Sequence, residues 1–168
     1  QNTSYDFDYP RALSGGLNVP FFSIYLPADT EAAGTSFSLA NELIDLMNSI
    51  IEANPEKFFL IDTSTYLGNL PGQNLIGIAY GMENGAALEG NLSNVEYFYK
   101  RGIRYITLTH SKSNHISDSS YDENKQWGGL SDFGKNLITE MNNVGIMIDS
   151  SHVSDAAFLQ AIDISNTP

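Results

Sequence analysis

An unbroken apolar run at residues 75–82, LIGIAYGM, constrains the fold of this chain more than any other feature. A continuous apolar run of this length is typical of a strand that is buried on both faces. Such strands occur in parallel sheets whose faces are covered by helices. The run therefore predicts an α/β fold, with Glu83 directly after the end of a buried strand.

The remaining elements alternate between strands and helices. Four buried strands are predicted over residues 19–26, 75–82, 103–108 and 146–149, and residues 58–61 also look extended. Helices are predicted over 35–53, 93–101, 131–143 and 154–164, with a short helical turn over 64–70. This alternation over short connections is typical of βαβ units, in which ligands bind at the carboxyl ends of the strands.

Composition and charge narrow the class of protein. The 168 residues are 42% hydrophobic, enough for a packed core in a single domain or part of one. Eight Lys and Arg against twenty Asp and Glu leave a net charge of −12, the wrong sign for a partner of nucleic acid or anionic membranes. No run approaches the roughly 18 apolar residues of a membrane span. Without cysteine, any metal must be held by His, Asp or Glu.

Ionisable residues follow three of the predicted strands. Glu83 follows IGIAYGM, His110 follows YITLT, and His152 follows IMIDSS. In a closed β/α barrel the strand ends converge on one rim, so we expect the three side chains to form a site. The alternative is that Glu83 caps a helix or orients a loop and that each histidine is a hydrogen-bonded polar group at a strand edge.

A site built from these residues favours zinc, which binds imidazole nitrogen and carboxylate oxygen. Asp149, three residues before His152, could orient that histidine or a neighbouring loop, or it could cap the next turn. The chain has no G-x-S-x-G turn, no G-x-G-x-x-G and no Walker A motif, which argues against serine hydrolysis and nucleotide binding.

Three further residues have structural interpretations. His115 lies in a polar loop and is interpreted as a solvated surface histidine. Glu89 is interpreted as a cap for the helix that begins near Ser93. Trp127 could face a substrate, but a loop anchor is favoured.

Three segments together resemble the renal or membrane dipeptidase family, zinc metallodipeptidases with a (β/α)8 barrel. They are GMENGAALEGNL, YFYKRGIRYITLTHSKSN and GLSDFGKNLITEMNNVGIMIDSSHVSD. The resemblance implies that Glu83 bridges two zinc ions, that His110 contacts the substrate and stabilises the tetrahedral intermediate, and that His152 binds one zinc ion. Asp149 is the acidic member of the D-x-x-HVS motif. The implied reaction is hydrolysis of dipeptides by a hydroxide that bridges the two ions.

The resemblance also implies that residues 1–168 form one partial domain, an internal portion of the barrel. The family's first strand, with a His-x-Asp pair of zinc ligands, and the C-terminal units, with a second histidine ligand, an arginine and an aspartate, are expected outside this chain. We therefore expect the fragment alone to hold too few ligands for two ions and to be inactive. Many relatives have a histidine where this chain has Ala86.

Two other functions stay open at this stage. One is a non-catalytic barrel that keeps the fold for binding, and the other is a different metal-dependent amide hydrolase, against which the LTH and D-x-x-HVS motifs weigh. The resemblance further implies a possible homodimer and a periplasmic or extracellular location, although no signal segment is present in this chain.

Overall fold

A computed structural model describes residues 6–62 and 74–167, and in them the chain forms a parallel sheet centred on β3 (Ile76–Glu83). The strand β1 (Phe21–Tyr25) pairs with residues 79–83 of β3, and β2 (Phe58–Leu60) pairs with residues 76–78. The strand β4 (Ile103–Thr107) pairs with residues 80–83 of β3, and β5 (Met147–Asp149) pairs with β4. Every pairing between these five strands is parallel, as the sequence predicts.

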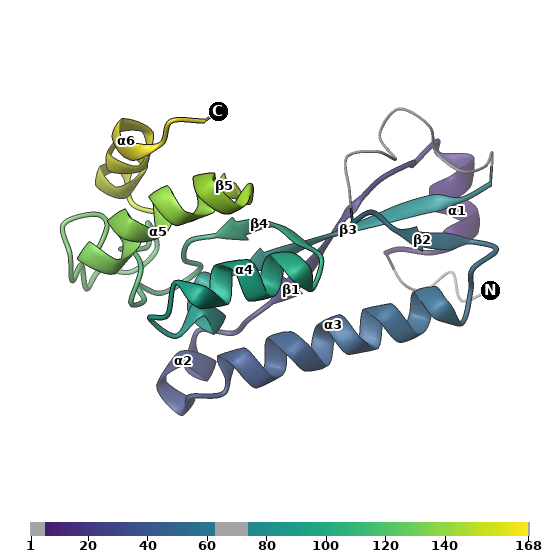
Figure 1. Cartoon of the computed structure of the whole chain (residues 1–168), viewed down its shortest axis with the longest axis horizontal. Coiled ribbons are helices and arrows are strands. Elements are labelled where there is room, and N and C mark those ends of the chain that lie inside the picture. The colour runs from purple at the N-terminus through teal and green to yellow at the C-terminus, as the bar shows by residue number, and fades with distance from the viewer. Residues whose placement is uncertain (1–5, 63–73, 168) are drawn as a thin grey trace.

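Helices alternate with these strands (Figure 1). The predicted helices are α3 (Ser36–Glu52), α4 (Ser93–Lys100), α5 (Asp132–Val144) and α6 (Asp155–Ile164). Three short elements were not predicted: α1 (Tyr9–Ser14), α2 (Asp29–Ala33) and the 3-10 helix η2 (Gly85–Leu88). The helical turn predicted over 64–70 lies outside the described residues. None of the described helices is long and apolar enough to cross a membrane.

The helix α1 has a start signal that the sequence analysis overlooked. The side chain of Asp8 accepts a hydrogen bond from the backbone N–H of Arg11 at 3.0 Å, and Pro10 lies in the first turn. An Asp cap followed by proline is a recognised helix start.

One face of the sheet, the outer face, packs against the helices, and the hydrophobic core lies between them. Alternate residues of the strands point toward the helices, and α3 contacts β1 and β2, α4 contacts β4, and α5 contacts β5. The buried side chains on this face and on the helices include Ile24, Tyr80, Met82, Ile106, Ala40, Ile44, Val95, Phe98, Leu137 and Met141. Burial raises the pKa of Tyr80 to about 12, and its hydroxyl donates to Asn48 Oδ1 at 2.9 Å.

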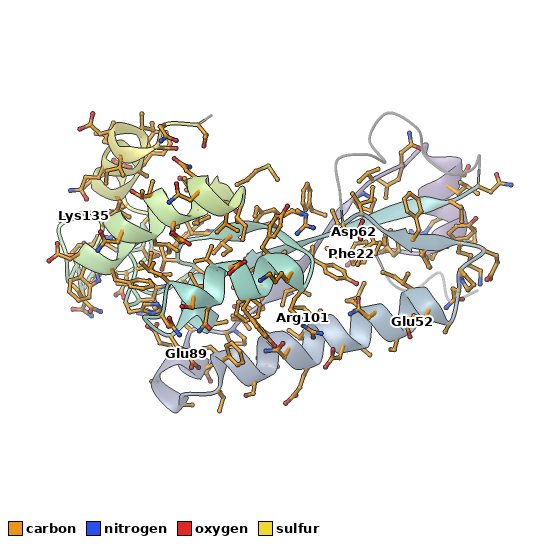
Figure 2. The ribbon with its side chains drawn as sticks, viewed as in Figure 1. Phe22, Glu52, Asp62, Glu89, Arg101 and Lys135 are labelled. Carbon is orange, nitrogen blue, oxygen red and sulfur yellow. The ribbon has the colours of Figure 1, made fainter. Side chains whose placement is uncertain are left out.

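A charged contact joins two of the covering helices. Arg101, directly after α4, points toward α3 (Figure 2) and donates to the Asp45 carboxylate at 2.6 Å and the Asn41 carbonyl at 3.3 Å.

One prediction fails on the inner face of the sheet, which is opposite the helices. The strand β3 is buried from Ile76 to Met82, but β1 and β5 are not buried on both faces. Phe21, Tyr25 and Met147 are 46%, 40% and 51% exposed, because no second layer covers their face within the described residues. Within the described residues, the expectation of four buried strands is therefore wrong for these two, whose inner faces are partly exposed.

The long loop between β4 and α5 folds around a buried carboxylate. Asp118 is fully buried and accepts hydrogen bonds from the backbone N–H groups of Gln126, Trp127 and Gly129. Burial alone would raise the pKa of Asp118, but these backbone donors outweigh it and hold the pKa below its ordinary value.

The start of α5 packs tightly against the same loop. Ser131 caps the helix by accepting from the N–H of Gly134 at 2.9 Å. A Cβ at position 134 would lie 2.2 Å from the carbonyl oxygen of Ile116, a backbone atom that cannot rotate away. The loop and the helix can therefore approach this closely only because residue 134 is glycine.

Gly134→Ala tests this contact. Alanine ordinarily stabilises a helix interior by about 1 kcal/mol over glycine. Here we expect a net loss of about 1–3 kcal/mol in the free energy of unfolding, because the new methyl group overpacks against the backbone. Urea denaturation measures the change, with Asn136→Ala at an exposed position of α5 as the control. Equal stability of the two variants would contradict this account.

The loop should also respond to acid. Because the folded-state pKa of Asp118 lies below the unfolded value of 3.8, its stabilisation is fully present above about pH 4 and is lost as pH falls through the folded-state pKa. Asp118→Asn should cost about 2 kcal/mol or more at pH 7, because three backbone donors lose a charged acceptor. It should also flatten the pH dependence of stability below pH 4. If the stability of this variant depended on pH below pH 4 as strongly as that of the wild type, the role assigned to Asp118 would be refuted.

Candidate functional site

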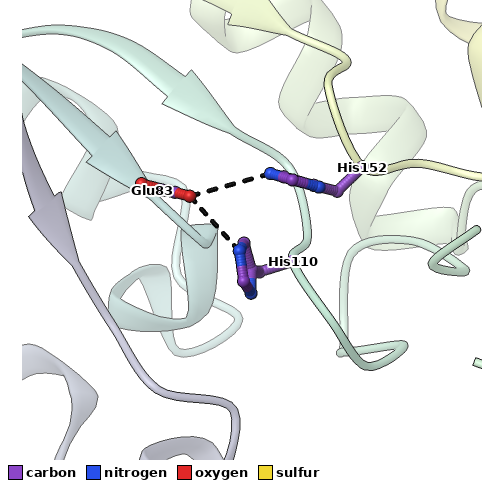
Figure 3. A group of neighbouring side chains, drawn as sticks. All are labelled: Glu83, His110 and His152. Carbon is purple, nitrogen blue, oxygen red and sulfur yellow. Dashed lines mark ion pairs between the residues drawn. The ribbon is translucent and has the colours of Figure 1, made fainter. Parts of the chain in front are cut away.

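Three side chains from different strand ends converge at the carboxyl edge of the sheet (Figure 3). Glu83 is the last residue of β3, His110 follows β4, and His152 follows β5. The Oε1 atom of Glu83 lies 3.2 Å from His110 Nε2 and 3.6 Å from His152 Nε2. The three donor atoms lie within 4.8 Å of one another, so the residues singled out in the sequence meet at one point.

The chemistry of this cluster suits a divalent metal ion. It offers two imidazole nitrogens and a carboxylate oxygen, the donors that zinc and similar metals bind. The side chains are only 24–28% exposed, and the imidazole centroids are 4.4 Å apart. The Nδ1 atoms of His110 and His152 are buried without a hydrogen-bond partner among the described residues. The Nε2 atoms, which face Glu83, are therefore the nitrogens that this geometry offers to a metal ion.

Strand register and a hydrogen bond hold Glu83 in place. Parallel pairing sets Tyr25 opposite Glu83 and Ser23 opposite Gly81. Because side chains alternate along a strand, Ser23 lies on the same face as Glu83 and donates to its Oε2 atom at 2.6 Å. Sequence reasoning missed Ser23, and the alternating pattern of FFSIY is the signal that could have found it.

Asp149 organises the turn before His152. Its Oδ2 atom accepts from Thr107 Oγ1 at 2.5 Å, which links β5 to β4. Its Oδ1 atom accepts from the backbone N–H and hydroxyl of Ser151 at 3.1 and 2.5 Å. None of the hydrogen bonds described for Asp149 involves His152. Of the alternatives left open by the sequence, the geometry fits a cap of the turn and an orienter of the loop.

Two carboxylates give the sheet around Tyr105 a negative electrostatic potential. The ring of Tyr105 lies over Gly81, where a Cβ would approach its Cζ atom to 2.0 Å. Burial, followed by the charges of Asp149 and Glu83, raises the pKa of Tyr105 above its ordinary value. The two nearby carboxylates favour a cation at this edge of the sheet.

Further residues that the sequence analysis missed hold the two histidines. The ring of Tyr25 lies edge-on to His110 at 5.0 Å, and Tyr121 lies 5.8 Å from His152. The hydroxyl of Ser119 donates to the His110 carbonyl at 2.5 Å, and the N–H of Ser120 donates to the His152 carbonyl at 2.8 Å. The loop between β4 and α5 therefore binds the backbone of both histidines. These contacts join segments that are distant in sequence, so no local sequence pattern predicts them.

His115 is not the solvated surface residue expected from the sequence. Its side chain is only 22% exposed, its Nδ1 lies 2.6 Å from Glu31 Oε1, and its ring packs on Phe133 at 5.1 Å. The unpredicted helix α2 brings Glu31 to this position, which is why the expectation was wrong.

The predictions for Glu89 and Trp127 have different outcomes. Glu89 accepts from the N–H of Phe37 at 3.3 Å and so caps α3, not the helix near Ser93 that was predicted. At the start of that helix, Asn91 accepts from the N–H of Ser93 at 3.0 Å instead. Trp127 donates from Nε1 to the carbonyl of Asn114 at 2.8 Å, which agrees with a loop anchor.

Comparison with other proteins gives consistent results. A sequence model of the membrane dipeptidase family (peptidase family M19) matches residues 1–168. Dipeptidase 3 of Mus musculus is 32% identical over 162 residues, which cover 94% of this chain and 32% of that protein. Dipeptidase aclJ of Aspergillus oryzae is 28% identical over 172 residues, which cover 96% of this chain and 40% of that protein.

Solved structures share the fold. An amidohydrolase of Pseudomonas aeruginosa superimposes with a TM-score of 0.83 and 26% identity, over 95% of this chain and 46% of that one. A metallopeptidase of Rhodobacter sphaeroides, liganded with a phosphinate mimic of the dipeptide L-Ala-D-Ala, superimposes with a TM-score of 0.86 and 21% identity, over 99% of this chain and 55% of that one.

These comparisons settle the fold and the family. The chain spans about a third to two fifths of the curated relatives' length and about half of the solved chains. The α/β fold predicted as a partial barrel is confirmed by the superpositions. Because the family model matches every residue from 1 to 168, the chain belongs to the membrane dipeptidase family, peptidase family M19.

Proposed function

We propose that the protein containing this chain hydrolyses dipeptides with the help of bound metal ions. The observation that carries the proposal is the convergence of Glu83, His110 and His152 within 4.8 Å at the carboxyl edge of a parallel sheet. Membership of the membrane dipeptidase family supports the reaction class. Dipeptide substrates, a homodimer and a periplasmic or extracellular location stay predictions for the whole protein.

The metal in this proposal is zinc, with two ions in the whole protein. Glu83 and His152 would be ligands, and Asp149 would support His152 through the turn that it caps. When bound, zinc polarises a carbonyl oxygen and lowers the pKa of water, which supplies a nucleophile at neutral pH. Ser23, through its hydrogen bond to Oε2, limits the rotation of the Glu83 side chain.

His110 has the catalytic and substrate-binding role in this proposal. Its Nε2 atom faces the cluster beside Glu83, so a protonated Nε2 can donate a hydrogen bond to the oxygen of a substrate carbonyl as negative charge develops on it. The ring of Tyr25 and the bond from Ser119 to the His110 carbonyl hold the imidazole in place. A donor that is fixed before the reaction needs little reorganisation in the transition state.

Removal of a ligand should weaken metal binding and abolish turnover. Glu83→Gln and His152→Ala, made in the full-length protein, should weaken zinc binding by more than the roughly 10- to 100-fold cost of losing an outer-shell partner. Zinc content and the hydrolysis rate of a small dipeptide panel, with and without a chelator, measure the effect. His115→Ala is the matched control, a half-buried histidine outside the cluster. A folded wild-type protein with neither metal nor turnover would instead support a binding role.

His110→Ala should separate catalysis from metal binding. We expect kcat to fall about 10²- to 10³-fold, as when one oxyanion donor is removed, with zinc content unchanged. Steady-state kinetics and metal analysis of the same sample provide the two readouts. Parallel loss of zinc would show that His110 is a metal ligand and would overturn its proposed role.

A further inference from the structure

Asn84, the residue directly after Glu83, has an unusual backbone conformation. Its φ is 82° and its ψ is 107°, and its side chain is almost completely buried, with 2% of the residue exposed. A residue other than glycine rarely adopts a positive φ, and it persists there only when surrounding contacts compensate. Asn84 and Glu89 are the two such residues in the described part of the chain, and Asn84 adjoins the metal cluster.

The side-chain amide of Asn84 makes those contacts. Its Nδ2 donates to the carbonyl of Leu26 at 3.0 Å, directly beyond the end of β1. Its Oδ1 accepts from Asn114 Nδ2 at 3.0 Å, and the same nitrogen donates to the carbonyl of Leu108 at 2.9 Å, directly beyond β4. The pair of asparagines therefore joins the carboxyl ends of three adjacent strands.

Asn114 is itself held by the β4–α5 loop in which it lies. Its Oδ1 accepts from the N–H groups of Ile116 and Ser117 at 2.8 and 3.1 Å, and the residue is 5% exposed. Its amide therefore has a set orientation. On the other side of the pair, the N–H of Leu26 donates to the Glu83 carbonyl at 3.0 Å, so the backbone of Leu26 contacts both Glu83 and Asn84.

We propose that Asn84 and Asn114 act as a positioning pair that sets the Glu83 carboxylate relative to His110. The pair fixes the backbone on the carboxyl side of Glu83 and the end of the strand that leads to His110. Because Leu108 lies two residues before His110, a change in the Asn84–Asn114 bond shifts the two donors relative to each other. None of the hydrogen bonds described for the two asparagines reaches a side chain of the cluster, so the pair acts through backbone position. This inference rests on the proposed metal site.

Two substitutions remove the link. Asn84→Gly tolerates the positive φ and removes both side-chain hydrogen bonds. Asn114→Asp keeps the volume and the oxygen that accepts from Ile116 and Ser117, but it puts a carboxylate oxygen in place of the nitrogen that donates to both Asn84 and the Leu108 carbonyl. Asn94→Ala is the control, since Asn94 Nδ2 also donates to a carbonyl, that of Leu88 at 3.1 Å, without touching Asn84 or Asn114.

The experiment uses the full-length protein, stripped of metal and titrated with Co²⁺, whose visible absorption reports ligand geometry. Competition with a coloured chelator gives the affinity, and thermal melting of the metal-free protein reports stability. We expect Asn84→Gly and Asn114→Asp to weaken Co²⁺ binding about 10- to 100-fold and to alter the absorption bands, as loss of outer-shell support does. Asn94→Ala should change neither quantity. The melting temperature of metal-free Asn84→Gly should stay close to that of the control.

The outcomes distinguish failure of the metal site from failure of the positioning pair alone. Wild-type protein that binds no Co²⁺, or Glu83→Gln protein that binds it as wild type does, overturns the metal site and the positioning pair with it. Wild-type binding that depends on Glu83, with unchanged affinity and spectrum in both asparagine variants, overturns the positioning pair alone. Losses in affinity no larger than in Asn94→Ala also overturn it, because they would reflect general destabilisation.

Discussion

The parallel register around β3 is the constraint on which the rest of the structure depends. Hydrogen bonding sets Tyr25, Glu83, Thr107 and Asp149 at one level of four adjacent strands. Since side chains alternate along each strand, these four share a face, while the intervening residues pack beneath the helices. A slip of one residue would move Glu83 into the apolar core, so burial of the outer face also fixes the chemistry of the inner one.

Register alone does not bring the histidines together, because both lie beyond the ends of their strands. Their positions come from the β4–α5 loop, in which Ser119 and Ser120 bind the two histidine carbonyls. That loop is organised by the buried Asp118 carboxylate and by the close approach of Ile116 to Gly134. The loop is therefore part of the structure that holds the site: it contains His110 and binds the backbone of His152.

Much of this could be predicted from residue patterns. The apolar run before Glu83 and the helical spacing of residues 35–53 reflect local burial, so they predict the main strands and helices. The ends of those strands in turn indicate Glu83, His110 and His152. Contacts between distant segments could not be predicted. Ser23 meets Glu83 only through strand pairing, and Glu89 caps α3 because η2 turns back toward it. His115 was misjudged for the same reason, since its partner Glu31 is 84 residues away in sequence.

The central claim is that Glu83 and His152 hold a metal ion beside His110. Anomalous diffraction at the zinc absorption edge, from crystals of the full-length protein grown with zinc, tests it most directly. The account predicts a peak within about 2.0–2.2 Å of a Glu83 carboxylate oxygen and of His152 Nε2, the bonding distances of zinc to oxygen and nitrogen. Zinc peaks elsewhere in the molecule, with none beside Glu83, would contradict it.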